Sequence, residues 1–87
     1  MAMTSKRKKA DTELGTRILR NMARVIERER EKRGLNKKEM AELCEVTYPF
    51  YFQILDGKAN PSLQTITRIC VNLDVPFQEL VSGAAPL

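Results

Sequence analysis

The chain is 87 residues long and carries 15 Lys and Arg against 11 Asp and Glu, a net charge of +4. This length is enough for one domain with a modest core. Histidine is absent, which removes the most common general base and metal ligand, and we find no constellation of polar residues that predicts a catalytic, cofactor or metal site. No apolar run approaches the roughly 20 residues of a membrane span, and none follows the basic N-terminus as a signal peptide requires. Composition therefore predicts a soluble, cytoplasmic protein that is not an enzyme.

The first ten residues contain a run of four basic side chains, Lys6, Arg7, Lys8 and Lys9, which equals the whole net charge. We predict a flexible N-terminal arm over residues 1–10. Such an arm can follow a DNA backbone or enter a minor groove. It can equally be a solubilising tail, and the sequence leaves both interpretations open.

A long helix is predicted from Asp11 or Thr12 to the residue before Gly34, because apolar residues recur at helical spacing from Leu14 to Ile26. A second stripe on this helix is basic and consists of Arg17, Arg20, Arg24 and Arg28. The alternating charges of residues 27–33 predict a solvated last turn.

Four shorter helices follow, and each has a start signal. Asn36, with Glu39 three residues later, predicts a capping box for the second helix. Thr47 caps the third helix, which tolerates Pro49 in its first turn. Ser62 caps the fourth, which Asp74 ends, and Pro76 opens the fifth. The predicted fold is all-α with five helices over residues 11–82, followed by a short tail at 83–87.

The second and third helices are only about two turns long, and three residues, Glu45, Val46 and Thr47, separate them. Helices this short are not stable alone, so each must bury its apolar face against other helices. A pair so short and so tightly joined is typical of a helix-turn-helix. Cys44 and Cys70 fall on apolar helical faces, and we interpret them as small buried thiols.

The runs Leu35–Ala41, Val46–Thr47 and Gly57–Leu63, together with the ending Leu73–Pro76, resemble the lambda-repressor-like helix-turn-helix family, also called Cro/CI or Xre-type regulators. The resemblance covers about two thirds of the chain. It implies a compact five-helix domain of phage or bacterial origin that represses or otherwise regulates transcription as a dimer on a near-palindromic operator. The protein would then act on double-stranded DNA at the bacterial nucleoid or in a phage-infected cell. The third helix would enter the major groove, while the start of the second would face a phosphate strand.

The resemblance places the base-contacting positions at Tyr48, Pro49, Phe52 and Gln53. Of these, only Gln53 has the donor and acceptor pair suited to an adenine edge. The family commonly has Gln where this chain has Lys37, and Gly where it has Glu45. Lysine can still reach a phosphate. At the tight turn, either Glu45 adopts a less favourable backbone or the turn differs slightly from that of the family.

Phosphate contacts are expected from the basic side chains near these positions and in the first helix, namely Arg17, Lys37, Lys38, Lys58, Lys6, Arg7, Lys8 and Lys9. A homodimer is expected because one half-site reader of this size has too little interface for useful specificity. We predict that the dimer interface is formed by the last helix, through Phe77, Leu80 and Val81.

A second function stays open, in which the same fold binds a protein such as a regulator, a polymerase subunit or a toxin. Tyr48 and Phe52 lie four residues apart and predict an outward aromatic pair of the kind that marks a contact surface. Acidic residues also outnumber lysines from residue 35 to residue 60, which favours a protein partner. The basic arm and the arginine stripe favour DNA.

Overall fold

The computed structural model describes residues 2–82, with side chains described from residue 13 onward. Within this range it contains five helices and no strand: α1 (Ala2–Arg33), α2 (Lys37–Cys44), α3 (Tyr48–Leu55), α4 (Leu63–Leu73) and α5 (Phe77–Val81). The predicted all-α fold is therefore confirmed. The predicted tail at 83–87 lies outside the described residues, and no helix within them is both long and apolar enough to cross a membrane.

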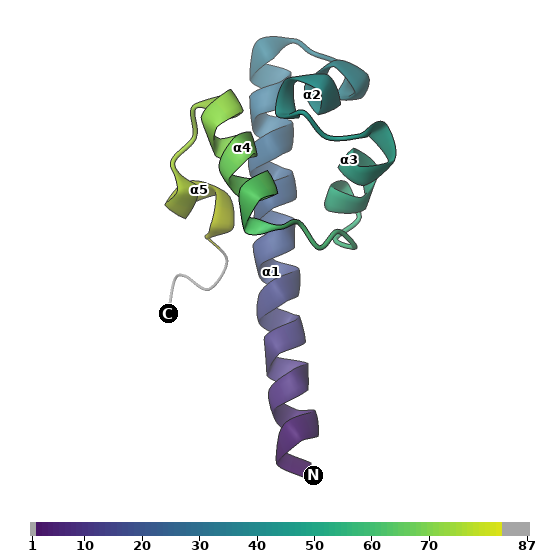
Figure 1. Cartoon of the computed structure of the whole chain (residues 1–87), viewed down its shortest axis with the longest axis vertical. Coiled ribbons are helices and arrows are strands. Elements are labelled where there is room, and N and C mark those ends of the chain that lie inside the picture. Colours follow the sequence, from purple (N-terminus) through teal and green to yellow (C-terminus); the bar gives the residue numbers. More distant parts are fainter. Residues whose placement is uncertain (1, 83–87) are drawn as a thin grey trace.

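Helix α1 is the axis of the fold, and Figure 1 shows its first turns extending beyond the other four helices. It begins at Ala2, earlier than the predicted start at Asp11 or Thr12. Residues 2–12 contain neither Pro nor Gly, so the sequence has no signal that would stop the helix there. The backbone predicted as a flexible arm is thus helical from Ala2, while its side chains lie outside the described residues.

The predicted caps are present. The Asn36 side chain accepts the Glu39 N–H at 2.8 Å, and the Glu39 carboxylate accepts the Asn36 N–H at 2.9 Å, which completes the capping box. The Thr47 and Ser62 hydroxyls accept N–H groups in the first turns of α3 and α4. These bonds satisfy amide donors that helix starts otherwise leave without partners.

At the tight turn between α2 and α3, the structure has the first of the two expected outcomes, a less favourable backbone at Glu45. Glu45 adopts the left-handed conformation, with φ of 59° and ψ of 43°. Its N–H donates to the Glu42 carbonyl at 3.0 Å, and the Val46 N–H donates to the Ala41 carbonyl at the same distance. The turn therefore closes α2 as a glycine would, at the cost of placing a side chain in a region that favours glycine.

The core lies where the other helices pack around the C-terminal half of α1. Helix α1 contacts α3 on one side and α5 on another, while α2 packs on α3 and α4. The fully buried large side chains come from all five helices: Met22, Val25, Ile26, Met40, Cys44, Tyr51, Ile54, Ile69, Leu73 and Leu80. Cys44 and Cys70 are buried free thiols, as predicted.

Candidate nucleic-acid interface

Helix α3 is held by one face and leaves the other open. Tyr51 and Ile54 are buried in the core, with at most 1% of their surface exposed. Because successive helical residues are about 100° apart, this packing turns the opposite side of the helix to solvent. Tyr48, Pro49 and Gln53 are exposed on it.

The aromatic pair is only partly as predicted. Tyr48 is 46% exposed, but Phe52 is half-buried rather than fully outward. The Phe52 ring lies edge-on to Tyr48 with ring centroids 4.8 Å apart, and edge-on to the buried Tyr51 at 6.3 Å. Phe52 therefore lies at the boundary between core and surface, and Tyr48 is the aromatic side chain of α3 that is exposed to solvent.

The start of α2 carries two lysines in different environments. Lys38 is exposed and has no ion-pair partner among the described side chains. The Lys37 ammonium is 3.1 Å from the Glu27 carboxylate of α1. Both were predicted phosphate contacts, but only Lys38 has its ammonium free of an internal partner.

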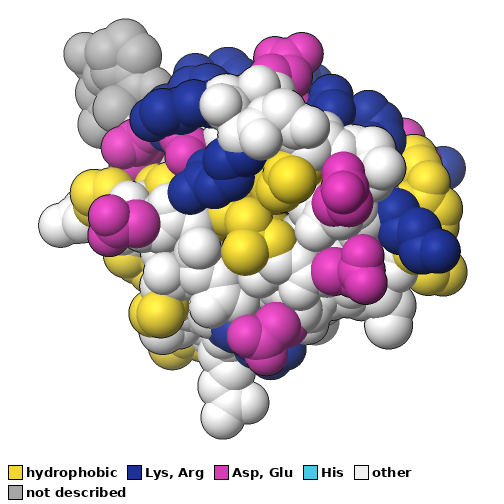
Figure 2. Space-filling view, turned by 90° about the horizontal axis from the view of Figure 1, so that it is seen from above, with side chains coloured by type: hydrophobic (Ala, Val, Ile, Leu, Met, Phe, Trp, Pro, Cys, Tyr) yellow, Lys and Arg dark blue, Asp and Glu magenta, His cyan; other side chains and the backbone are white. Residues whose placement is uncertain are grey.

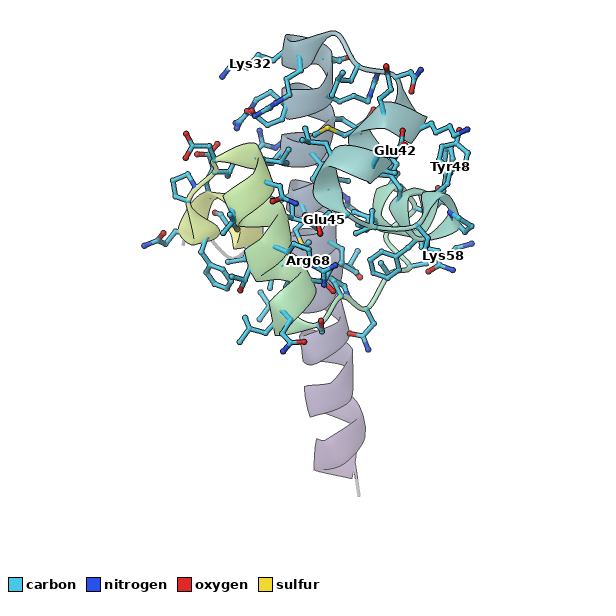
Figure 3. All side chains as sticks on the ribbon, turned by 45° about the horizontal axis from the view of Figure 1, so that its top comes forward. Lys32, Glu42, Glu45, Tyr48, Lys58 and Arg68 are labelled. Carbon is cyan, nitrogen blue, oxygen red and sulfur yellow. The ribbon has the colours of Figure 1, made fainter. Side chains whose placement is uncertain are left out.

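Lys58 lies in the turn that follows α3. Its backbone N–H donates to the Gln53 carbonyl at 2.8 Å, which fixes the turn against the end of the helix. Its side chain is exposed, and Figure 3 shows Lys58 and Tyr48 on the same outer side of the molecule. Glu42 is also on this side in Figure 3, and Lys38, one turn earlier, shares the face of α2 on which Glu42 lies. Lys58 thus lies on the side on which α3 is open, and Lys38 is exposed one turn before Glu42 on α2.

Acidic groups interrupt this surface. Glu42 and Asp56 are exposed beside the lysines, whereas the Glu45 carboxylate accepts a hydrogen bond from Asn72 of α4. Viewed from above, the molecule shows Lys and Arg interleaved with Asp and Glu around exposed hydrophobic side chains (Figure 2). The exposed carboxylates of Glu42 and Asp56 offset the charges of Lys38 and Lys58, so any strong attraction to phosphate needs a contribution from elsewhere in the chain.

The arginine stripe of α1 lies on another side of the molecule. Arg17 is one turn before Asn21, whose amide donates to the carbonyls of Glu79 and Leu80 at 2.8 and 3.1 Å. Arg28, on the same face, pairs with Glu79. This face of α1 therefore borders α5, and the structure does not bring Arg17 next to Lys38 and Lys58. The side chains of Lys6, Arg7, Lys8 and Lys9 lie outside the described residues.

The predicted dimer interface needs one correction. Leu80 is fully buried, because it is the residue through which the short helix α5 packs into the core. Phe77 is 42% exposed and Val81 is half-buried, so these two residues keep surface that a second copy could cover. Within the described residues, no group of His, Cys, Asp or Glu could hold a metal ion.

Two functional candidates were missed in the sequence, both in the charged end of α1. Glu29 is only 5% exposed and Glu27 is half-buried, so the last turns of α1 are not simply solvated as predicted. A signal was present for Glu29, which follows the core residues Met22 and Ile26 at spacings of seven and three. No pattern in the sequence distinguishes Glu27.

A family model described as helix-turn-helix matches residues 26–80. The chain therefore belongs to the lambda-repressor-like (Cro/CI, Xre-type) helix-turn-helix family, which is a family of DNA-binding regulators and not of enzymes. Over 54 residues the chain is 28% identical to the HTH-type transcriptional regulator DdrOP3 of Deinococcus deserti, an alignment that covers 62% of this chain. The same alignment spans 42% of that relative, less than half of its length. The comparison with solved structures found no match.

Proposed function

We propose that this chain binds double-stranded DNA and regulates transcription. The observation that carries the proposal is the open face of α3. This helix buries Tyr51 and Ile54 on one side and exposes Tyr48, Pro49 and Gln53 on the other. An α-helix presented in this way fits the width of a major groove. The site of action is then the chromosome of a bacterium or phage, in the cytoplasm.

Each exposed residue of α3 has a proposed role in reading bases. The Gln53 amide can donate to and accept from one adenine edge. Tyr48 and Pro49, with the accessible part of Phe52, offer apolar surface to thymine methyl groups. Lys38 and Lys58 flank α3 and contact phosphates, which position the protein without specifying sequence.

Selection of binding sites from a random pool of DNA duplexes tests this proposal. We expect one sequence to be enriched, with half-sites about one helical turn apart if two copies bind together. Gln53→Ala should then lose preference at one base position, by about 1–3 kcal/mol. Gln64→Ala, a matched change at an exposed residue of α4, should bind as the unchanged protein does. No enrichment even at low salt would contradict the proposal.

The DNA-bound form is proposed to be a homodimer that pairs through Phe77 and Val81. Phe77 is 42% exposed and Val81 is half-buried, so both residues have apolar surface that a second copy would cover. Sedimentation at micromolar concentration should give a dimer mass that Phe77→Ser reduces to the monomer mass. A monomeric protein that still binds a palindrome tightly would overturn the dimer.

A protein partner is the second candidate function, and the exposure of Tyr48 is the observation that favours it. Tyrosine supplies much contact area at low entropic cost, and Glu42 and Asp56 beside α3 suit a basic partner. If this function holds, Tyr48→Ala should abolish capture of that partner while Gln53→Ala leaves it intact. The reverse pattern, loss of DNA preference in Gln53→Ala alone, supports DNA.

A further inference from the structure

The carboxylate of Glu27 in α1 is contacted by side chains from three helices. The Tyr51 phenol of α3 donates to it at 2.6 Å, the Lys37 ammonium of α2 at 3.1 Å, and the Arg30 guanidinium of α1 through two bonds of 3.1 Å. Its side chain is 26% exposed. A single carboxylate thus joins α1, α2 and α3.

Each of these contacts fixes a different part of the helix-turn-helix. Tyr51 is the central buried residue of α3, so its phenol sets the rotation and height of that helix against α1. Arg30 also donates to the Leu35 carbonyl at 2.8 Å, which fixes the turn between α1 and α2. Apolar packing is non-directional, whereas these charge-assisted hydrogen bonds require one geometry. The hydrogen bonds to Glu27 therefore fix the orientation of α2 and α3 on α1 more closely than apolar packing alone would.

The same contact changes what Lys37 can do. Its ammonium is directed toward Glu27, and the side chain is 37% exposed. A phosphate approaching Lys37 would have to compete with a carboxylate already in contact. Lys38, the next residue, has no such partner among the described side chains and is exposed.

We propose that Glu27 is a positioning residue for DNA binding: it fixes α3 through Tyr51 and holds Lys37 away from the phosphate backbone, leaving that contact to Lys38. This inference rests on the proposed DNA-binding function. It replaces the sequence-based assignment of Lys37 to phosphate.

The salt dependence of DNA binding separates the two lysines. Each phosphate contact contributes about 0.9 to the slope of log K against log salt concentration. On the duplex selected from the random pool, Lys38→Met should lower the slope by about 0.9, while Lys37→Met leaves it unchanged. A decrease of about 0.9 in Lys37→Met would overturn the proposal, because Lys37 would then contact phosphate.

Removing the charge of Glu27 should release Lys37. On an unrelated duplex of equal length, Glu27→Gln should therefore steepen the slope by about 0.9, and adding Lys37→Met to Glu27→Gln should cancel that increase. Glu31→Gln is the matched control, because Glu31 is an exposed carboxylate of the same helix, and it should leave the slope unchanged. A structural defect alone would weaken binding without steepening the slope.

Tyr51→Phe tests the positioning of α3 separately. This change keeps the buried ring and removes only its hydroxyl group, so Lys37 stays paired with Glu27. We expect the ratio of affinities for the selected and the unrelated duplex to fall about five-fold or more, the value of one well-placed base contact, with the salt slope unchanged. A ratio equal to that of the unchanged protein would overturn this part of the proposal.

A measurement without DNA distinguishes failure of the network from failure of the function. Burial alone would raise the pKa of the Glu27 carboxyl, but hydrogen bonds from Arg30, Tyr51 and Lys37 outweigh burial and lower it. Carbon-13 NMR titration should therefore show a higher Glu27 pKa in Tyr51→Phe and in Lys37→Met. If both variants raise this pKa and no duplex is bound, the network stands and the proposed function fails. If neither variant raises this pKa, the proposed positioning role of Glu27 is wrong, regardless of the DNA-binding results.

Discussion

The Arg33 guanidinium donates a hydrogen bond to the Leu73 backbone carbonyl at 3.0 Å, which joins the last turn of α1 to the last turn of α4. The Glu29 carboxylate, one turn earlier on α1, pairs with the same guanidinium and also with Arg28. Arg28 in turn pairs with Glu79 of α5. The buried carboxylate of Glu29 therefore anchors a charged network that holds α4 and α5 against α1.

Replacing Glu29 by Ala should lower the free energy of unfolding by about 1–3 kcal/mol, because two guanidinium groups lose their buried acceptor. The solvent that reaches Arg28 and Arg33, whose side chains are 44% and 31% exposed, keeps the cost below that of a fully buried pair. Urea unfolding measures the change. Glu31→Ala, an exposed carboxylate in the same part of α1, is the control and should change stability by no more than about 0.5 kcal/mol. Equal costs would mean that the network contributes nothing specific.

Stability should fall in acid because two carboxylates are held below their ordinary pKa of 4.5. For Glu29, the Arg33 hydrogen bond lowers the pKa and burial opposes it. For Glu27, burial raises the pKa but the hydrogen bonds from Arg30, Tyr51 and Lys37 outweigh it. Both groups bind a proton more readily in the unfolded chain than in the folded one. Their stabilisation is thus complete above the ordinary value and is lost as the pH falls through the folded-state pKa.

Urea unfolding between pH 7 and pH 3 checks this dependence. The unchanged protein should lose stability below about pH 4.5, in the range where an ordinary carboxyl titrates. The double variant Glu27→Gln/Glu29→Gln should start less stable at pH 7 and lose less over the same range. A double variant whose stability falls as steeply as that of the unchanged protein would assign the acid sensitivity to other groups.

The starts of α2, α3 and α4 could be predicted from the sequence because each depends on local chemistry. Asn36, Thr47 and Ser62 cap neighbouring amides, and such bonds need no knowledge of the rest of the fold. The left-handed backbone of Glu45 was expected on different grounds, because the family that the sequence resembles commonly has Gly at this position.

The start of α1 and the charged network could not be predicted in the same way. Residues 2–12 have charges that suit either a helix or an arm, and composition alone does not decide between them. Glu27 acquires its role from Tyr51, a partner 24 positions away in the chain. The half-burial of Phe52 and the full burial of Leu80 likewise depend on how α3 and α5 sit on α1, which periodicity within one helix does not specify.

Glu45 should be replaceable by Gly with a gain in stability of up to about 1 kcal/mol. A residue other than Gly in the left-handed region costs roughly 1–2 kcal/mol. Glycine removes this cost, but its larger unfolded-state entropy offsets part of the gain in stability. The loss of the exposed hydrogen bond from Asn72 is a small further cost. Glu45→Val is the matched opposite, because a β-branched side chain is disfavoured at positive φ, and it should be destabilising. Thermal unfolding that ranks Val equal to Gly would exclude backbone strain at this turn.

The burial pattern of α4 predicts a large loss of stability at one aliphatic residue of that helix and almost none at another. Ile69 is fully buried and Val71 is 72% exposed. Ile69→Ala should cost about 2–5 kcal/mol, the range for emptying a packed site, and Ile54→Ala in α3 should fall in the same range. Val71→Ala should change stability by less than about 0.5 kcal/mol. Similar costs at residues 69 and 71, measured by urea unfolding, would show that the rotation of α4 is different from the one described.

The basic run at the start of α1 should contribute to DNA affinity without contributing to sequence preference. The face around α3 has mixed charge, whereas Lys6, Arg7, Lys8 and Lys9 form the longest uninterrupted run of positive charge in the chain. Changing all four to Gln keeps the length of the chain and should lower the salt slope by about 0.9 for each phosphate that is no longer neutralised. The base preference in the selected duplex should be retained, because phosphate contacts do not specify sequence. Thermal unfolding of the same variant should be unchanged, since the fully buried residues among the described side chains of α1 begin at Met22. An unchanged salt slope would assign the run to solubility alone.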